Sequence, residues 1–317
     1  MPAVQSLADR LAERTARHDM RSRWFGAGRT VIAVAQLSFM LLTPVKALLV
    51  PVVGLGDYPH CNSVRAASAM CLGDTGVGPE AQRWLLIVIL AVAASGYRPR
   101  WTAIPHAWAT YSIAVSIAVP DGGESVAMIM CFFMIPIGLA DDRTWHWQQP
   151  TRELAPSWRT LTFVAFLAVR VQIAYLYLDS AISKFGVADW ANGTAEYYFL
   201  RDNMFGVGKP WDGLFLTLSK SAFVVVALTW GALIIEIAIG VCVLASDRWR
   251  KAGLAMDIVL HGSIILTMGL WSFALVMIGS AVVCATPEGR APSGARGTAR
   301  PATDDLQVQV RPPSPVH

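Results

Sequence analysis

The chain has 317 residues, of which 54% are hydrophobic and only 15% are charged. Soluble domains carry about 25% charged residues. This composition and the mean hydropathy of +0.46 therefore exclude an ordinary soluble protein. The net charge is +4, but the basic residues form short clusters between apolar runs, which excludes a continuous surface for nucleic acid. The composition predicts an integral protein of a lipid bilayer.

The two ends of the chain differ from its centre. Residues 1–29 hold six arginines, too many for the basic region of a cleaved signal peptide, and are predicted to form a cytoplasmic, basic, amphipathic arm. Residues 287–317 are rich in Pro, Ala, Gly, Ser and Thr and lack the apolar content needed to fold alone, which predicts a disordered cytoplasmic tail. Residues 30–286 form the predicted transmembrane domain.

Apolar runs bounded by charge or by Pro and Gly predict an all-α fold, a polytopic transmembrane bundle of about eight helices. The second and the last run are shorter than the roughly 17 residues that a span usually needs. They are either tilted spans or re-entrant segments. The predicted helices are 30–50, 82–96, 102–119, 124–140, 161–182, 218–245, 253–270 and 272–286.

The distribution of basic residues predicts the orientation. With eight spans, the side of the N-terminus carries 18 of the 26 Lys and Arg residues, the opposite side carries 7, and Arg170 lies within a span. The positive-inside rule then places both termini in the cytoplasm of a multi-pass plasma membrane protein. Two longer loops, 51–81 and 183–217, are extracytoplasmic in this arrangement.

The first of these loops contains Cys61 and Cys71. Outside the reducing cytosol the two cysteines can form a disulfide that closes a small loop. The alternative is a pair of free, partly buried thiols. The other three cysteines lie in predicted spans, where small core residues are the default interpretation.

The fifth predicted helix carries a polar stripe. Arg170, Tyr177 and Lys184 follow one another at intervals of seven residues, which keeps all three on one side of the helix. Ionisable groups within spans are costly and usually face the interior of a bundle, so this helix is predicted to lie at the centre. Arg170 and Tyr177 are candidate substrate-binding residues. The alternative is that Arg170 and Lys184 only snorkel or form ion pairs.

The sixth and seventh predicted helices supply further ionisable groups. Glu236 is a solitary carboxylate in an apolar run, whereas Asp257 and His261 are four residues apart and share a face. We expect Glu236 and His261 to be catalytic together with Lys184, and Asp257 to bind substrate. The alternative is that Asp257 only orients His261 and that Glu236 only caps a break in a neighbouring backbone.

Residues 190–205 mix aromatic and charged side chains at helical spacing, which predicts an outer interfacial helix that covers the bundle as a lid. Trp190, Tyr197 and Tyr198 are candidate substrate contacts. A plain interfacial anchor would have the same composition. Asp121, in the turn at 119–125, is either a solvated turn residue or an acidic contact to this lid.

Motifs of soluble enzymes are absent from the sequence. It contains no Walker loop, no GxGxxG, no HExxH and no GxSxG. His106, His146 and His261 lie in different segments without metal-ligand spacing, so no metal is predicted.

Several ordered motifs carry a resemblance to a known family. The stretches GYRPRWTAIPHAWATYSIAVS, VPDGGE, IPIGLADDRTWHW and QIAYLYLDSAISKFGVADWANGTAEYYFLRDNMFG together resemble the SdpB-like family, membrane proteins required to mature a secreted sporulation-delaying antimicrobial peptide. The resemblance covers about residues 25–284. It implies maturation or export of a secreted antimicrobial peptide, a bacteriocin. The implied partners are the peptide precursor and a small SdpA-like companion subunit.

That family is in turn similar to the HTTM domain of vitamin K-dependent gamma-glutamyl carboxylase. The shared pattern is an aromatic helix that ends in Lys and is followed by Trp and Gly, which are here Tyr175, Tyr177, Lys184, Trp190 and Gly193. The resemblance implies that the last two contact substrate.

A carboxylate and a histidine, here Glu236 and His261, follow in the same order. In the carboxylase a lysine of this pattern deprotonates a quinol, so the resemblance implies that Lys184 is a base and that a quinone or quinol is the cofactor. Ser183 and Lys184 stand where the carboxylase has two lysines, and this chain lacks the carboxylase's large soluble domain. Carboxylation of glutamate is therefore not implied.

Three functions follow from these expectations. The first is a membrane factor that matures or exports a secreted antimicrobial peptide by base or quinone-linked chemistry at the extracytoplasmic face. The second is a quinone-dependent membrane oxidoreductase, or a carboxylase-like enzyme, with another substrate. The third is a non-enzymatic transporter or scaffold.

Overall fold

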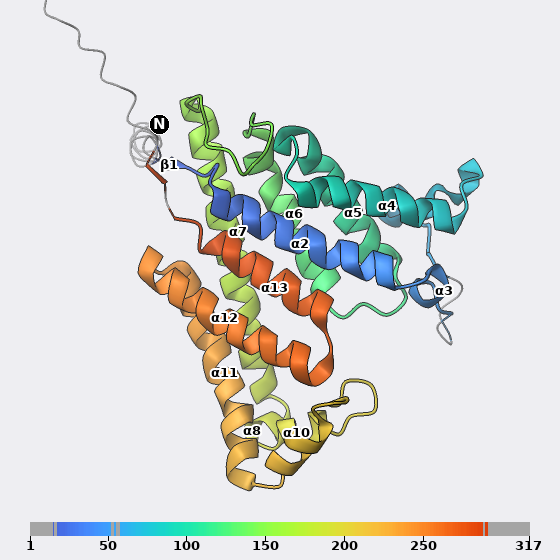
Figure 1. Ribbon diagram of the computed structural model, residues 1–317, viewed down its shortest axis with the longest axis vertical. Coiled ribbons are helices and arrows are strands. Elements are labelled where there is room, and N and C mark those ends of the chain that lie inside the picture. The colour runs from blue at the N-terminus through green and yellow to red at the C-terminus, as the bar shows by residue number, and fades with distance from the viewer. Residues whose placement is uncertain (1–14, 16–17, 52–53, 55–57, 288, 291–317) are drawn as a thin grey trace, which may run out of the picture.

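In a computed structural model, each predicted apolar run forms a helix, and these helices pack as a bundle (Figure 1). The structure describes residues 15, 18–51, 54, 58–287 and 289–290. Within them the fold is all-α apart from one two-stranded pairing and an isolated β-bridge. The long helices are α2 (Arg23–Leu42), α4 (Pro79–Ser95), α5 (Pro99–Ser116), α6 (Gly123–Leu139), α7 (Pro156–Phe185), α11 (Ala222–Leu244), α12 (Asp247–Met268) and α13 (Trp271–Cys284).

Local residue chemistry explains where these helices begin and end. Pro at the first helical position starts α4, α5 and α7, because its fixed φ suits a helix and its missing N–H would be unpaired there. Gly96 and Gly269 end α4 and α12 with φ of 80° and 71°, a conformation that glycine adopts without strain. The predicted first helix, 30–50, was wrong at both ends. The helix α2 begins at Arg23, seven residues earlier than predicted and directly after its N-cap Ser22, and it ends before Pro44.

Within the described ranges, four helices are long and apolar enough to cross a membrane: α2, α7, α11 and α12. Large apolar side chains on their outer faces are exposed, among them Ile234, Val241 and Val259. A soluble protein would bury such side chains, whereas a lipid bilayer solvates them. The chain is therefore a membrane protein. The helices α6 and α13 are apolar but shorter.

The helix α7 lies at the centre of the bundle, as its polar stripe predicts. It packs against α6, α11 and α13 and runs along much of the long axis of the molecule (Figure 1). Phe166, Val169 and Ile173 on α7 are fully buried among these neighbours.

The most extensive contact between described helices joins α2 and α13, and two glycines make this approach possible. A Cβ on Gly28 would lie 2.6 Å from the carbonyl oxygen of Gly279 and 2.5 Å from Val283. A Cβ on Gly279 would lie 3.0 Å from the carbonyl oxygen of Gly28. Small residues at such crossings let the backbones approach and increase van der Waals contact within a membrane.

The segment between α7 and α11 is not the single interfacial helix predicted for 190–205. It forms α8 (Ala188–Ala191), α9 (Ala195–Phe199) and α10 (Asp212–Leu218), beside the end of α7 (Figure 1). Gly193 ends the first of these with φ of 76° and separates it from the second. Helical spacing of aromatic residues did not reveal this break. We call residues 187–205 the lid segment.

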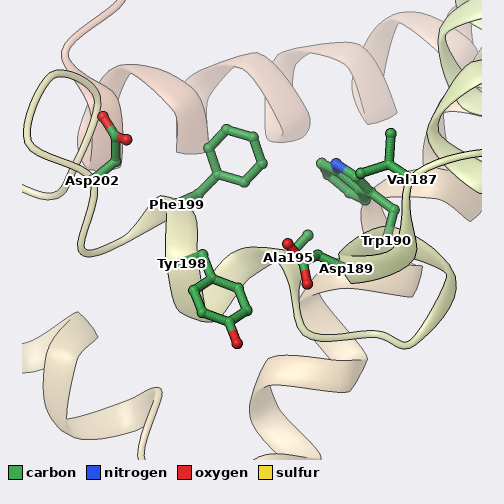
Figure 2. A pocket seen from close by; sticks show the side chains of 7 residues that line it. All are labelled: Val187, Asp189, Trp190, Ala195, Tyr198, Phe199 and Asp202. Atoms are coloured by element: carbon green, nitrogen blue, oxygen red, sulfur yellow. The ribbon is translucent and has the colours of Figure 1, made fainter.

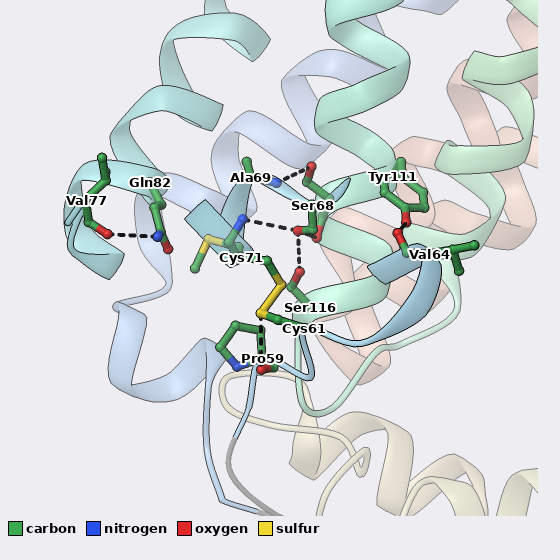
Figure 3. The surroundings of a disulfide bond; sticks show 12 residues. Pro59, Cys61, Val64, Ser68, Ala69, Cys71, Val77, Gln82, Tyr111 and Ser116 are labelled. Atoms are coloured by element: carbon green, nitrogen blue, oxygen red, sulfur yellow. Dashed lines mark hydrogen bonds between the residues drawn. A yellow bond between two sulfur atoms is a disulfide. The ribbon is translucent and has the colours of Figure 1, made fainter. Parts of the chain in front are cut away.

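The loop after α2 carries a short helix, α3 (Val45–Leu48), and two 3-10 helices, η1 (Ser63–Ala67) and η2 (Ala69–Thr75). Cys61 and Cys71 form a disulfide with a Cα–Cα distance of 5.5 Å (Figure 3). Hydrogen bonds fasten this loop to α5: the Oγ atoms of Ser68 and Ser116 are 2.7 Å apart, and the N–H of Ala69 donates to Ser112 Oγ at 2.9 Å.

The two ends of the described chain meet. Strand β1 (His18–Asp19) pairs antiparallel with β2 (Gly289–Arg290). Arg21 donates to Asp19 and forms an ion pair with Asp142, in the loop between α6 and α7. Most of the predicted arm before residue 18, and most of the predicted tail, 287–317, lie outside the described residues.

Candidate functional site

The structure pairs Lys184 with Glu236. The ammonium at the end of α7 donates hydrogen bonds to Glu236 Oε1 on α11 and to Ser180 Oγ, one helical turn earlier on α7, at 3.0 Å. The side chains are largely buried, with 24% of Lys184 and 12% of Glu236 exposed. Glu236 Oε2 is buried and has no hydrogen-bond partner among the described residues. One carboxylate oxygen is therefore left to bind a further donor.

The lid segment contacts this ion pair through Trp190. The Lys184 ammonium lies 5.0 Å from the centre of the indole ring, which is the geometry of a cation–π interaction. Trp230 on α11 donates its indole N–H to the Trp190 carbonyl at 3.2 Å. A Cβ on the buried Gly193 would lie 3.2 Å from Val226, so glycine allows both the turn and the close approach to α11.

Glu196 on α9 is a further acidic group near Lys184 that the sequence interpretation did not single out. Burial raises the pKa of its carboxyl, and the positive charge of Lys184 opposes this shift without reversing it. Its backbone N–H donates to Thr229 Oγ1 on α11 at 3.2 Å. The position of Glu196 within residues 190–205, the segment predicted to cover the bundle, could have identified it from the sequence. Two carboxyl groups, on α9 and α11, thus flank one lysine.

A second polar cluster lies deeper in the bundle. Tyr177 on α7 donates a hydrogen bond to Asp257 Oδ1 on α12. The same oxygen is 3.1 Å from Nδ1 of His261. Asp257 is fully buried, and its Oδ2 has no hydrogen-bond partner among the described residues.

The two clusters are adjacent but distinct. His261 was predicted to act beside Lys184, but the side chain that contacts Lys184 is Glu236. His261 instead belongs with Tyr177 and Asp257. Glu236 lies within electrostatic range of Tyr177, which connects the clusters along α7.

Arg170 lies apart from Lys184. It is 14 residues earlier on α7, about 21 Å along the helix axis. Its guanidinium donates to the carbonyls of Val243 and Ala245 at 2.8 and 3.0 Å and so satisfies the C-terminal end of α11. These bonds favour a structural role for Arg170 at the end of α11 over a contact with substrate.

Asp121 and Tyr197 also have local partners. Asp121 Oδ1 accepts the N–H of Gly123 at 2.8 Å, the geometry of a turn that precedes α6. The ring of Tyr197 stacks with the guanidinium of Arg201 at 3.8 Å. Among the described residues no hydrogen bond or ion pair joins Asp121 to the lid segment, which favours the turn alternative.

The lid segment contains a pocket of about 250 Å³ (Figure 2). Tyr198, predicted as a substrate contact, and Trp190 both line it, and the ring centres of Trp190 and Phe199 are 5.8 Å apart. The remaining lining residues are Val187, Asp189, Ala195 and Asp202. The pocket therefore combines aromatic faces with two carboxylates, directly beside the lysine site.

A third buried polar group lies between α2, α5 and α6. Arg29 donates to Thr102 Oγ1 at 2.8 Å, and Cys131 Sγ is 3.7 Å from Nε2 of His106. Gln36, two turns after Arg29, is 1% exposed and has no hydrogen-bond partner among the described residues. His106 was considered from the sequence, and Cys131 only as one of the three cysteines in predicted spans; their contact was not predicted, since they belong to different helices.

This geometry supports proton transfer more readily than metal chemistry. Lys184 and Glu236 share a hydrogen bond along which a proton can pass. Within the described part of the chain, no three His, Cys, Asp or Glu side chains are grouped as metal ligands.

The fold and the site define a polytopic helical membrane protein with an ionisable centre beside an aromatic lid. The chain is also similar in sequence to known proteins. The chain is 31% identical to the sporulation-delaying protein SdpB of Bacillus subtilis over 229 residues, which cover 72% of this chain and 71% of SdpB. The chain belongs to the SdpB-like family.

A second relative extends the similarity along the chain. The protein YitO of Bacillus subtilis is 31% identical over 286 residues, 89% of this chain and 92% of YitO. No family model and no solved structure matches the chain.

Proposed function

We propose that this protein matures a secreted antimicrobial peptide, or assists its export, and that Lys184 is the base of its reaction. The observation that carries this proposal is the buried contact of Lys184 with Glu236 beneath an aromatic lid. Glu236 accepts a hydrogen bond from the Lys184 ammonium and is therefore placed to receive its proton. The similarity to SdpB supports the biological role.

The proposed site faces outward. We infer that all eight long helices cross the membrane, that both termini are cytoplasmic, and that the lid segment and the Cys61–Cys71 loop are extracytoplasmic. The excess of basic residues on the side of the N-terminus supports this orientation. A disulfide between Cys61 and Cys71 also suits an oxidising compartment. An exported peptide would meet Lys184 on that side.

The other groups of the site have distinct roles in this proposal. Ser180 and Trp190 hold the Lys184 ammonium in place through a hydrogen bond and a cation–π contact. Glu196 adds a carboxyl that can exchange a proton with the reacting groups. Tyr177, Asp257 and His261 form a buried relay behind the site. An SdpA-like subunit would complete the system as a partner.

A quinone or quinol, which the HTTM resemblance implies, fits the described pocket poorly. A quinone ring requires an apolar slot with hydrogen-bond donors to its oxygens. The pocket that contains Trp190 also carries the carboxylates of Asp189 and Asp202, whose negative charge would face the electron-rich oxygens of a quinone. The residues of this pocket therefore do not suit a quinone.

Co-expression with the peptide precursor tests the proposal. Lys184→Ala should lower the yield of mature peptide by about 10²-fold or more, the usual contribution of a general base, when mass spectrometry measures the secreted product. Lys220→Ala, which removes an exposed lysine, is the matched control. Normal maturation by a membrane-inserted Lys184→Ala protein would disprove the catalytic role. A peptide of unchanged mass with altered secretion would favour the transporter or scaffold.

A further inference from the structure

The pocket of the lid segment has two carboxylates without a basic partner. The backbone N–H groups of Met204 and Phe205 donate to Oδ1 of Asp202 at 2.7 and 2.8 Å and leave Oδ2 available. The Oδ1 of Asp189 is 3.5 Å from Thr194 Oγ1, at the limit of a hydrogen bond. Neither aspartate forms an ion pair within the described part of the chain. Both remain free to bind a cation.

The basic residues near the pocket are already engaged. Lys184 pairs with Glu236, and Arg201 stacks on Tyr197 and donates to its carbonyl at 2.9 Å. Lys184 or Arg201 could pair with one of the two aspartates only by giving up its present contact with Glu236 or Tyr197. The pocket therefore has an unmatched negative charge. The backbone amides of Phe205 and Met204 lower the pKa of Asp202, so its carboxylate is ionised at neutral pH.

Aromatic side chains line the same cavity. Trp190, Tyr198 and Phe199 contribute to its wall (Figure 2). Aromatic faces attract organic cations through their quadrupoles, and adjacent carboxylates add a direct charge contact. The volume of about 250 Å³ lies below the roughly 300–1,000 Å³ of pockets for drug-sized ligands, so a single side chain or a small headgroup suits it.

The backbone around the pocket is held in place before any ligand arrives. The N–H of Thr194 donates to the Asp189 carbonyl at 2.8 Å across the turn between α8 and α9. The N–H of Val207 donates to the Leu200 carbonyl at 3.2 Å and closes the loop that contains Asp202. A preformed site loses less conformational entropy on binding.

We propose that this pocket binds a lysine or arginine side chain of the peptide on which the protein acts, an inference that rests on the proposed function. Trp190 contacts Lys184 and also lines the pocket, so a basic residue bound here places the neighbouring peptide bonds at the lysine site. The pocket is thus a specificity site beside the reacting centre.

Peptide binding to the full-length protein in lipid nanodiscs tests this proposal. The probe is a dye-labelled peptide, Ala-Phe-Lys-Phe-Ala, and its matched neutral version carries Gln in place of Lys. We expect the lysine peptide to bind about tenfold more tightly, with an affinity that falls as salt rises. The double variant Asp189→Asn/Asp202→Asn keeps the side-chain oxygens that accept hydrogen bonds and should bind the lysine peptide about tenfold more weakly.

Asp212→Asn, which removes a carboxylate of α10 outside the pocket, should bind as the wild type does. Equal affinity for the two peptides, or unchanged binding by the double variant, overturns the inference. If phosphocholine binds and the lysine peptide does not, the pocket is a headgroup site and the inference is also overturned. This test measures peptide binding, whereas the test of Lys184 measures the mass of the secreted product, so a failed binding test leaves the proposed chemistry of Lys184 independently testable.

Discussion

Tyr177 on α7 donates its hydroxyl hydrogen to the fully buried carboxylate of Asp257 on α12, across an interface between helices that are 80 residues apart in sequence. His261 contacts the same oxygen. Buried carboxylates are costly unless they accept hydrogen bonds, so Tyr177 and His261 together make Asp257 tolerable at this depth. The contact also fastens α12 to the central helix.

Removal of the tyrosine hydroxyl tests this contact. Tyr177→Phe leaves the Asp257 carboxylate with fewer donors, and we expect it to lower the free energy of unfolding by about 1–3 kcal/mol. Tyr175→Phe, on the exposed face of the same helix, is the matched control and should change stability by less than about 0.5 kcal/mol. Equal denaturation midpoints of the two variants in detergent micelles would contradict the assignment.

The ion pair of Lys184 and Glu236 predicts non-additive stability effects. Lys184→Met or Glu236→Leu alone leaves one charge largely buried, so each should cost about 2–3 kcal/mol, somewhat below a fully buried pair because Lys184 is partly exposed. The double variant removes both charges and should recover at least about 1 kcal/mol of the summed loss. Simple additivity in a double-mutant cycle would argue against a direct pair.

The disulfide predicts a loss of stability on reduction. Cys61 and Cys71 are 10 residues apart, and a loop of this size restricts the unfolded chain by about 3 kcal/mol. The double variant Cys61→Ser/Cys71→Ser should have a lower melting temperature than the wild type. Reductant should lower the melting temperature of the wild type but not that of the variant. A wild-type protein whose melting temperature is the same with and without reductant would show that the bridge contributes nothing.

The lowered pKa of His146 predicts that the free energy of unfolding falls in acid. It lies in the loop between α6 and α7, and burial, together with the charges of Arg29 and Arg143, lowers its pKa from 6.5 to about 3. Between these values the unfolded state binds more protons than the folded state, so stability falls as the pH falls through this window. At pH 5 the free energy of unfolding should be about 2 kcal/mol lower than at neutral pH.

Unfolding measured from pH 7 to pH 4 checks this prediction. His146→Asn removes the titrating ring, so its stability should vary less with pH than that of the wild type. The substitution should also lower stability at neutral pH, because the ring fills the space between Gly26 and Gly96. An equally steep pH dependence in the variant would assign the effect to other groups.

The crossing of α2 and α13 predicts a strong preference for glycine. Gly28→Ala would place a Cβ 2.6 Å from the Gly279 carbonyl oxygen and should cost about 1–3 kcal/mol through overpacking. Gly231→Ala on α11 is the matched control, since no atom lies within 4 Å of its added Cβ. It should be neutral or stabilising by up to about 1 kcal/mol, because alanine favours a helix. Thermal unfolding of both variants separates packing from helix propensity.

Some features of the fold could be predicted from the sequence, whereas others could not. Pro79, Pro99 and Pro156 begin helices within five residues of the predicted starts, because the rules for proline are local. The intervals between Arg170, Tyr177 and Lys184 indicated the central helix, since seven residues are nearly two turns. Gly193 was named as a contact, but its positive φ, which breaks the predicted interfacial helix, was not anticipated.

The sequence by itself determined the membrane class, the helical runs and the stripe of ionisable groups, because hydrophobicity and periodicity are properties of neighbouring residues. Tertiary structure alone decided which groups meet. It paired Lys184 with Glu236, 52 residues away, and assigned His261 to Tyr177 and Asp257 instead. The physical reason is that helix rotation and crossing angle depend on side-chain packing across the whole bundle, which no local pattern records.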